Sequence, residues 1–208
     1  MVNKNYRDKL ESFLTKNFVA TGFNITKPIA LDPVRESSKY EALTFALDEK
    51  NIAYRKGKIT PDRPGAFLAI WQRPATTDIN DNKPIPLTSN QLDYLFIQVQ
   101  NHTNDEANKV LNNSLLNNSA TSGMFIFPVS MLIEKGIVSS TKSKGKTGFR
   151  VFPPWSQNRG SIGTKVFSES AKKTQQWQLP YFLEINKHDL LDSQELNKIF
   201  SSKRCNPA

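Results

Sequence analysis

Cysteine and histidine are nearly absent from this sequence, and their scarcity excludes several kinds of site. The chain contains one cysteine, Cys205, and two histidines, His102 and His188, in 208 residues. An internal disulfide is therefore impossible, and neither histidine has a second ligand at the spacing of a zinc site. We expect no structural metal centre.

Long apolar runs are lacking as well. No stretch approaches the ~20 apolar residues that a membrane-spanning helix needs, and the start of the chain lacks the apolar region of a signal peptide. The sequence predicts a cytoplasmic protein that does not cross a membrane.

Acidic residues are outnumbered by basic ones. The chain has 28 Lys and Arg against 19 Asp and Glu, which gives a net charge of +9 and a pI near 9.6. Such an excess favours polyanions as partners through simple electrostatics. Nucleic acid is the leading candidate, and an anionic membrane surface is the second.

The hydrophobic pattern predicts a single α+β domain over residues 1–208. Apolar residues at steps of three and four predict an amphipathic helix over 4–18. Residues 42–73 are typical of three successive strands, which suggests a meander. A short helix should follow Pro128, and a last one should begin with Ser193 as its N-cap. Further strands are expected at 92–100, 123–128 and 148–152. We expect a central, mostly antiparallel sheet flanked by helices.

Basic side chains concentrate in two segments. Residues 54–74 carry five cations with Asp62 as the single acid, and residues 141–173 carry eight cations with Glu169 as the single acid. The second segment also holds Phe149, Phe152, Trp155 and Phe167. Bases can stack on such rings while Lys and Arg neutralise phosphates. The alternative is that the aromatic residues belong to the core and the lysines to a solvated loop.

The motifs of nucleotide binding and nucleophilic hydrolysis are missing. The triplet Gly145, Lys146 and Thr147 lacks the earlier glycine and the following helix of a phosphate-binding P-loop. There is no Gly-x-Ser-x-Gly turn, and neither histidine stands in a structured segment. The sequence predicts no nucleotide cofactor and no serine hydrolase chemistry.

A metal-dependent nuclease stays open. Cleavage of phosphodiesters with Mg²⁺ requires carboxylates that converge on the ion, usually with a lysine nearby. Glu41 and Asp93 are the candidate acids and Lys58 is the candidate lysine, although the compact acid and Lys pattern of restriction-type nucleases is missing. The alternative is that both acids are strand-edge carboxylates paired with neighbouring cations.

Several segments, in their order and spacing, resemble the MepB family of small bacterial proteins. The matching stretches are "ESSKYEALTF", "YRKGKITPDRPGAFLAIWQRP", "LDYLFIQV", "GMFIFPVSMLIEKGIVSS", "GKTGFRVFPPWS" and "AKKTQQWQLPYF". The family core would cover residues 36–182, with an inserted Asn-rich loop at 101–122 and a C-terminal extension at 186–208. Gln72 departs from the family's usual lysine, and Phe152 departs from its usual tyrosine.

This resemblance implies a fold similar to restriction-endonuclease-type nucleases, with binding of DNA or RNA as the expected activity. The family is named for genes carried beside a multidrug efflux transporter, and the resemblance assigns no catalytic role to any residue. We expect the cations of both basic segments to face one groove, with two glutamines offering hydrogen bonds to sugar or base edges. The candidate residues of this interface are Lys56, Lys58, Arg73, Lys146, Arg150, Trp155, Lys172, Lys173, Gln175 and Gln178.

Three functions therefore remain to be separated. The preferred one is a sequence-tolerant nucleic-acid-binding protein on a nuclease-like scaffold, which needs no cofactor. The second is a nuclease that would require Mg²⁺. The third is an accessory protein in drug or stress response, whose basic face meets an acidic protein or a small anion.

Overall fold

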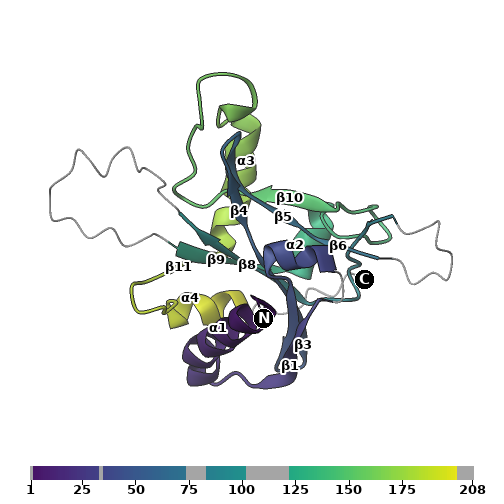
Figure 1. The fold of residues 1–208 in the computed structure, drawn as a ribbon, viewed down its shortest axis with the longest axis vertical. Helices are drawn as coiled ribbons and strands as arrows, with labels where there is room; N and C mark the ends of the chain where they lie inside the picture. Colours follow the sequence, from purple (N-terminus) through teal and green to yellow (C-terminus); the bar gives the residue numbers. More distant parts are fainter. Residues whose placement is uncertain (1, 33–34, 74–82, 102–121, 201–208) are drawn as a thin grey trace, which may run out of the picture.

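The main element of the fold is a six-stranded sheet. The computed structural model describes residues 2–32, 35–73, 83–101 and 122–200, and the strand order of the sheet is β1-β2-β3-β8-β9-β11 (Figure 1). The strands are β1 (Ile25–Leu31), β2 (Leu43–Leu47), β3 (Lys50–Lys56), β8 (Tyr94–Gln100), β9 (Ser122–Pro128) and β11 (Phe182–Ile185). Neighbours are antiparallel except for the parallel pair β3 and β8. The predicted mixed fold with a mostly antiparallel sheet is confirmed, whereas its likeness to restriction endonucleases stays a prediction.

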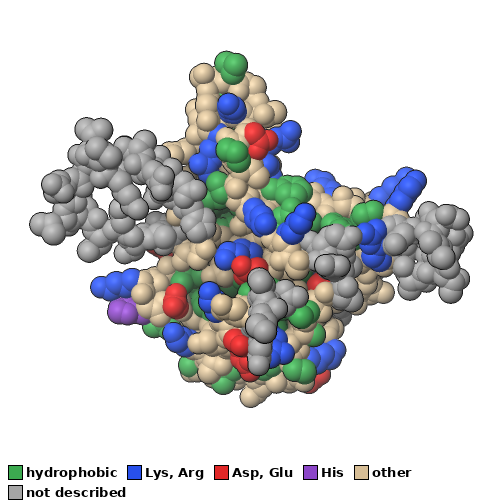
Figure 2. Space-filling view, in the orientation of Figure 1, with side chains coloured by type: hydrophobic (Ala, Val, Ile, Leu, Met, Phe, Trp, Pro, Cys, Tyr) green, Lys and Arg blue, Asp and Glu red, His purple; other side chains and the backbone are tan. Residues whose placement is uncertain are grey.

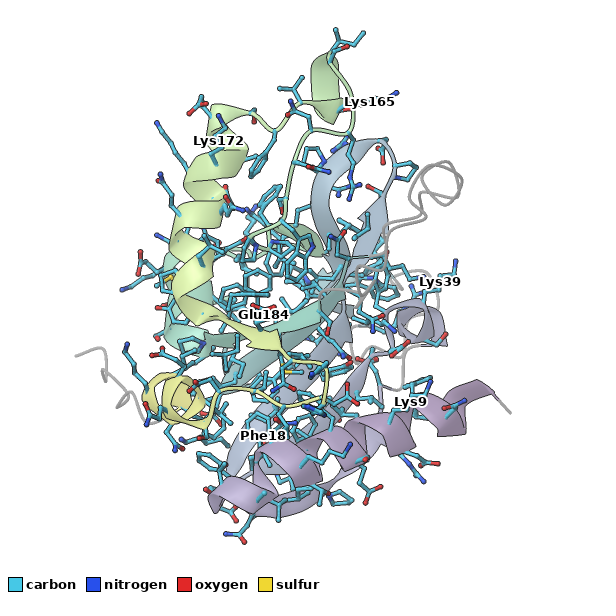
Figure 3. All side chains as sticks on the ribbon, turned by 90° about the vertical axis from the view of Figure 1, so that its left-hand side faces the viewer. Lys9, Phe18, Lys39, Lys165, Lys172 and Glu184 are labelled. Atoms are coloured by element: carbon cyan, nitrogen blue, oxygen red, sulfur yellow. The ribbon has the colours of Figure 1, made fainter. Side chains whose placement is uncertain are left out.

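Helices α1 (Val2–Asn17) and α4 (Ser193–Phe200) cover one face of this sheet. Leu10 and Leu14 on α1 are buried, as is Phe18, which is labelled between α1 and the sheet in Figure 3. The predicted amphipathic helix is therefore confirmed. The expected N-cap of α4 is wrong by one residue, because Oδ1 of Asp192 accepts the hydrogen bonds from the backbone N–H groups of the first turn.

A second, three-stranded sheet covers the opposite face. Its order is β10-β5-β4, with β4 (Lys58–Thr60), β5 (Arg63–Ala69) and β10 (Gly148–Val151). Its inner side chains pack against the six-stranded sheet together with α2 (Val129–Glu134) and α3 (Glu169–Gln178). The buried residues of this second core include Ala66, Leu68, Leu95, Ile97, Phe125, Phe127, Phe149 and Val151. Figure 1 shows the resulting three layers, with the six-stranded sheet in the middle.

The predicted meander is wrong, because the chain leaves the six-stranded sheet at Gly57. The backbone N–H of Gly57 still donates to Gln98, over 2.8 Å. A Cβ added at Gly57 would lie 3.0 Å from Cγ1 of Val99 and 3.1 Å from Cβ of Ala66. Glycine thus lets the two sheets approach closely, and the hairpin of β4 and β5 folds over the first sheet instead of extending it.

Several elements were not predicted from the sequence, and β1 and α3 are the two longest of them. Strand β1 contains Pro28, which lacks a backbone donor and is tolerated because β1 is an edge strand. Helix α3 is almost entirely polar, so its hydrophobic pattern is weak. Its N-cap is Ser168, whose hydroxyl accepts a hydrogen bond from the backbone of Ala171.

Some sequence features lie outside the described residues. These are Cys205, His102 and nearly all of the Asn-rich loop at 101–122. None of the helices in the described part of the chain is long and apolar enough to cross a membrane. A third, small sheet pairs β6 (Trp71–Gln72) with β7 (Ile85–Pro86).

Candidate nucleic-acid interface

A cation, an aromatic ring and a second cation line up across the outer face of the three-stranded sheet. Lys58 on β4 and Arg150 on β10 both stand opposite Phe67 on the central strand β5. Residues directly opposite each other in antiparallel strands project from the same face. We call Lys58, Phe67 and Arg150 the cationic row. The Phe67 ring is only partly buried, and the Cζ atom of Arg150 lies 5.7 Å from its centroid.

The ring of Phe67 has space because of a glycine on the neighbouring strand. A Cβ added at Gly148 would come within 2.7 Å of Cζ of Phe67, so the ring covers this position of β10. Tyr40 meets the ring edge-on, with 6.1 Å between centroids, and Nζ of Lys58 lies 5.5 Å from the Tyr40 centroid. The row is thus an aromatic surface with a cation at each side.

Neutral groups hold the Arg150 guanidinium in place. Its NH2 group donates to Oγ1 of Thr60 over 2.8 Å, and its NH1 group donates to the carbonyl of Pro64 over 3.3 Å. Partial burial lowers the pKa of Arg150, and the nearby Asp62 carboxylate opposes that shift. Arginine stays protonated in any case. Since its hydrogen-bond acceptors are neutral, the charge remains available to an anionic ligand.

A pocket of about 350 Å³ opens beside the row, between β10, α3 and the segment that follows α2. Its cations are Lys135, Lys146 and Arg150, and its apolar wall includes Phe149, Phe152 and Trp177. Because Arg150 belongs to both, the pocket and the cationic row form one continuous basic surface. We call this cavity the basic pocket.

Two predicted contact residues hold α3 against β10. Gln178 is fully buried, and its Oε1 accepts from the backbone N–H of Phe152 over 2.8 Å while its Nε2 donates to the carbonyl of Arg150 over 3.0 Å. Nε2 of Gln175 donates to the carbonyl of Pro153 over 2.8 Å. These amides, expected to contact sugar or base edges, are engaged with the backbone and position the wall of the basic pocket.

Cations at the end of β3 are engaged in ion pairs. Arg55 is 1% exposed and its NH2 group lies 2.8 Å from Oδ2 of Asp32. Burial lowers the pKa of Arg55, and the Asp32 carboxylate opposes the shift. Lys56 pairs with Glu41 over 3.1 Å. These pairs tie β3 to the segment that precedes β2, so Lys56 has a structural partner where we predicted a nucleic-acid contact.

The remaining predicted residues are distributed over the structure. Arg73 lies after β6, outside the three-stranded sheet, with its guanidinium 4.9 Å from the Trp71 ring. Trp155 packs edge-on against Phe182 in the second core. Lys172 pairs with Glu169 on exposed α3, and Lys173 is exposed on the same helix. Figure 2 shows Lys and Arg side chains over the part of the molecule formed by α3 and the β4–β5 hairpin.

The candidate nuclease acids stand at opposite ends of β3. Oδ2 of Asp93 accepts from the backbone N–H of Asn51 near the start of the strand, whereas Glu41 pairs with Lys56 at its end. Five residues of strand separate these positions, which is roughly 16 Å. The described residues contain no group of three His, Cys, Asp or Glu that could hold a metal ion. These two acids therefore do not fit a shared Mg²⁺ site.

Several members of the site were not among the candidates, including Phe67, Tyr40 and Lys135. Phe67 and Tyr40 were given no role from the sequence, and Lys135 lies in a segment with no excess of basic residues. Phe67 could have been found from the alternation of side chains in the strand "GAFLA". This alternation places Phe67 on the face of the strand opposite to the buried Ala66 and Leu68. The sequence alone did not say which face of that strand was open.

Comparison with known proteins gives two matches. The crystal structure of MepB is similar to this chain, with a TM-score of 0.54 and 29% sequence identity over 86% of this chain and 98% of that one. A comparison with curated proteins found no match. The family model described as MepB-like matches residues 34–118 and 104–184. This match spans more than half of the sequence, and the chain belongs to the MepB-like family.

Proposed function

We propose that this protein binds nucleic acid without strong sequence preference, through the cationic row and the basic pocket. The observation that carries the proposal is the partly exposed Phe67 ring between Lys58 and Arg150 on one face of a sheet. Bases stack on such rings whatever their identity, and flanking cations neutralise the phosphates on either side. The proposal places the protein in the cytoplasm and on a nuclease-like scaffold.

Binding without cleavage is the favoured form of this function. The acids suspected of holding Mg²⁺ are used elsewhere, because Asp93 accepts from the β3 backbone and Glu41 pairs with Lys56. The open sheet face supplies positive charge and an aromatic surface, which are binding groups. An accessory role in drug or stress response is compatible with the same surface if its partner is another polyanion.

The test is binding of labelled single- and double-stranded DNA and RNA across a salt series, followed by fluorescence anisotropy. If about four to six cations contact phosphates, log affinity should fall against log salt with a slope of roughly −3 to −5. Parallel samples with and without Mg²⁺ are then run on a denaturing gel. Intact strands are expected in both, and shortening that depends on Mg²⁺ would refute binding without cleavage.

Variants of the row show whether this surface is responsible. Replacing Lys58 and Arg150 together by glutamine should weaken binding and flatten the salt slope by about 1.4 to 1.8. The matched control replaces Lys9 and Lys16 by glutamine, since both are exposed on α1 on the other side of the six-stranded sheet; Lys9 is labelled in Figure 3. Equal affinity of the row variant and the control would refute the proposed interface.

A further inference from the structure

The basic pocket has the size of a site for one small ligand. At about 350 Å³ it lies at the lower end of the range for small-molecule sites, roughly 300 to 1,000 Å³. This space suits one nucleotide and is too small for a duplex. Because Arg150 also belongs to the cationic row, a strand lying on the row could place its end in the pocket without crossing another surface.

The charge of the pocket favours a dianion. Lys135, Lys146 and Arg150 supply three positive charges, and Glu134, 2.7 Å from Nζ of Lys135, offsets one of them. A phosphodiester inside a strand carries one negative charge. A terminal phosphate monoester carries about −1.5 to −2 at pH 7. The Asp62 carboxylate likewise offsets part of the Arg150 charge. The three cations still exceed these two acids, and a lining with net positive charge attracts a monoester, with its larger charge, more strongly than a diester.

The apolar wall is suited to the base of the same nucleotide. Phe149 and Phe152 are about nine-tenths buried, while Trp177 is partly exposed and is held by packing against Phe127, with 5.5 Å between ring centroids. The Trp177 ring is thus fixed before any ligand arrives. A flat ring against this wall would leave its phosphate at the rim, where Lys146 is exposed.

We propose that the basic pocket binds the terminal nucleotide of a strand that carries a phosphate monoester, with the phosphate at Lys146 and Arg150 and the base against Trp177. This inference rests on the proposed nucleic-acid binding. A free nucleoside monophosphate offers the same chemistry, so the experiment must separate the two sources.

The experiment compares short single strands with a 5′-phosphate, a 3′-phosphate or hydroxyls at both ends, with adenosine monophosphate as a free ligand. One phosphorylated end should bind about tenfold more tightly or better than the unphosphorylated strand, as expected for new charge-assisted hydrogen bonds. Equal affinity for all three strands would overturn the inference and leave the proposed function standing. Monophosphate binding without any strand binding would refute both, and would reassign the pocket to a free nucleotide.

Two variants locate the effect. Thr174→Phe fills the pocket from α3 and keeps its cations, and Gln176→Phe is the control at an exposed position of the same helix. Thr174→Phe should remove the preference for a phosphorylated end, measured as the ratio of the affinities for the phosphorylated and unphosphorylated strands, whereas Gln176→Phe should keep that ratio. Lys146→Ala changes an exposed side chain and should weaken the same preference, which keeps the test valid if Thr174→Phe folds poorly. Survival of the preference in Lys146→Ala and in a folded Thr174→Phe would overturn the inference.

Discussion

Replacing Gln178 by alanine tests how α3 is held against β10. The side chain is fully buried and makes two hydrogen bonds to backbone groups, the N–H of Phe152 and the carbonyl of Arg150. Alanine would leave both backbone groups without these partners, on a strand that carries one side of the cationic row. We expect a loss of stability before any loss of a ligand contact.

The size of the loss follows from these two bonds. An unsatisfied buried donor or acceptor costs about 1 to 3 kcal/mol, and alanine avoids the conformational entropy that glutamine loses on burial. Gln178→Ala should therefore lower the free energy of unfolding by about 2 to 4 kcal/mol. For a chain of this size that corresponds to a fall in Tm of roughly 4 to 16 °C.

Urea denaturation followed by circular dichroism measures this difference, with an unchanged m-value as evidence for the same unfolding transition. The control is Gln176→Ala, an exposed position on α3 that should stay within about 0.5 kcal/mol of the parent protein. Gln175→Ala loses one hydrogen bond and should fall between them. If Gln178→Ala is as stable as Gln176→Ala but binds nucleic acid less well, Gln178 is a ligand contact and our account of α3 is wrong.

Three other predictions address the remaining polar contacts. Asp32→Asn leaves the buried charge of Arg55 without the carboxylate that pairs with it. The free energy of unfolding, measured by urea denaturation, should fall by about 3 to 5 kcal/mol. A fall of less than about 1 kcal/mol would show that the ion pair does not stabilise the fold. A hydrogen bond from Thr60 lowers the pKa of the Asp62 carboxyl group. This hydrogen bond should therefore stabilise the fold above the ordinary carboxyl pKa of ~3.9, and the stabilisation should be lost as the pH falls through the pKa of Asp62 in the folded protein. In Thr60→Val, NMR titration of the carboxyl groups should show the pKa of Asp62 return toward its ordinary value. Phe67→Ala should weaken single-strand binding by about 1 to 3 kcal/mol and duplex binding by less, and anisotropy showing equal losses would contradict base stacking.

The parts of the fold that could be predicted are those encoded in local pattern. The first two strands expected within residues 42–73 are an example: β2 and β3 pair as a hairpin, and Asp48 and Glu49 close it with the positive φ angles of a two-residue turn. Strands β8 and β9 are nearly continuous apolar runs, since both of their faces are covered by packed layers.

The parts that could not be predicted depend on contacts between distant segments. The departure of the chain at Gly57 is set by its closeness to Val99 and Ala66, which no local pattern contains. In the same way, the charge count placed Arg55 in a basic segment and marked Lys56 as a binding residue, but the ion-pair partners of both come from the segment that precedes β2. Composition counts cations and does not show which of them are already neutralised.

The long sequence separation within the cationic row has a consequence for folding. Lys58 and Phe67 come together in a local hairpin, whereas Arg150 reaches Thr60 across 90 residues of chain. Closing such a loop costs entropy that local pairs do not, so contacts of this kind form late. A ribosome-bound or truncated chain that ends before β10 would have the hairpin but lack Arg150 and the basic pocket. The surface that we propose for nucleic-acid binding is therefore complete only in a chain that has been synthesised beyond β10.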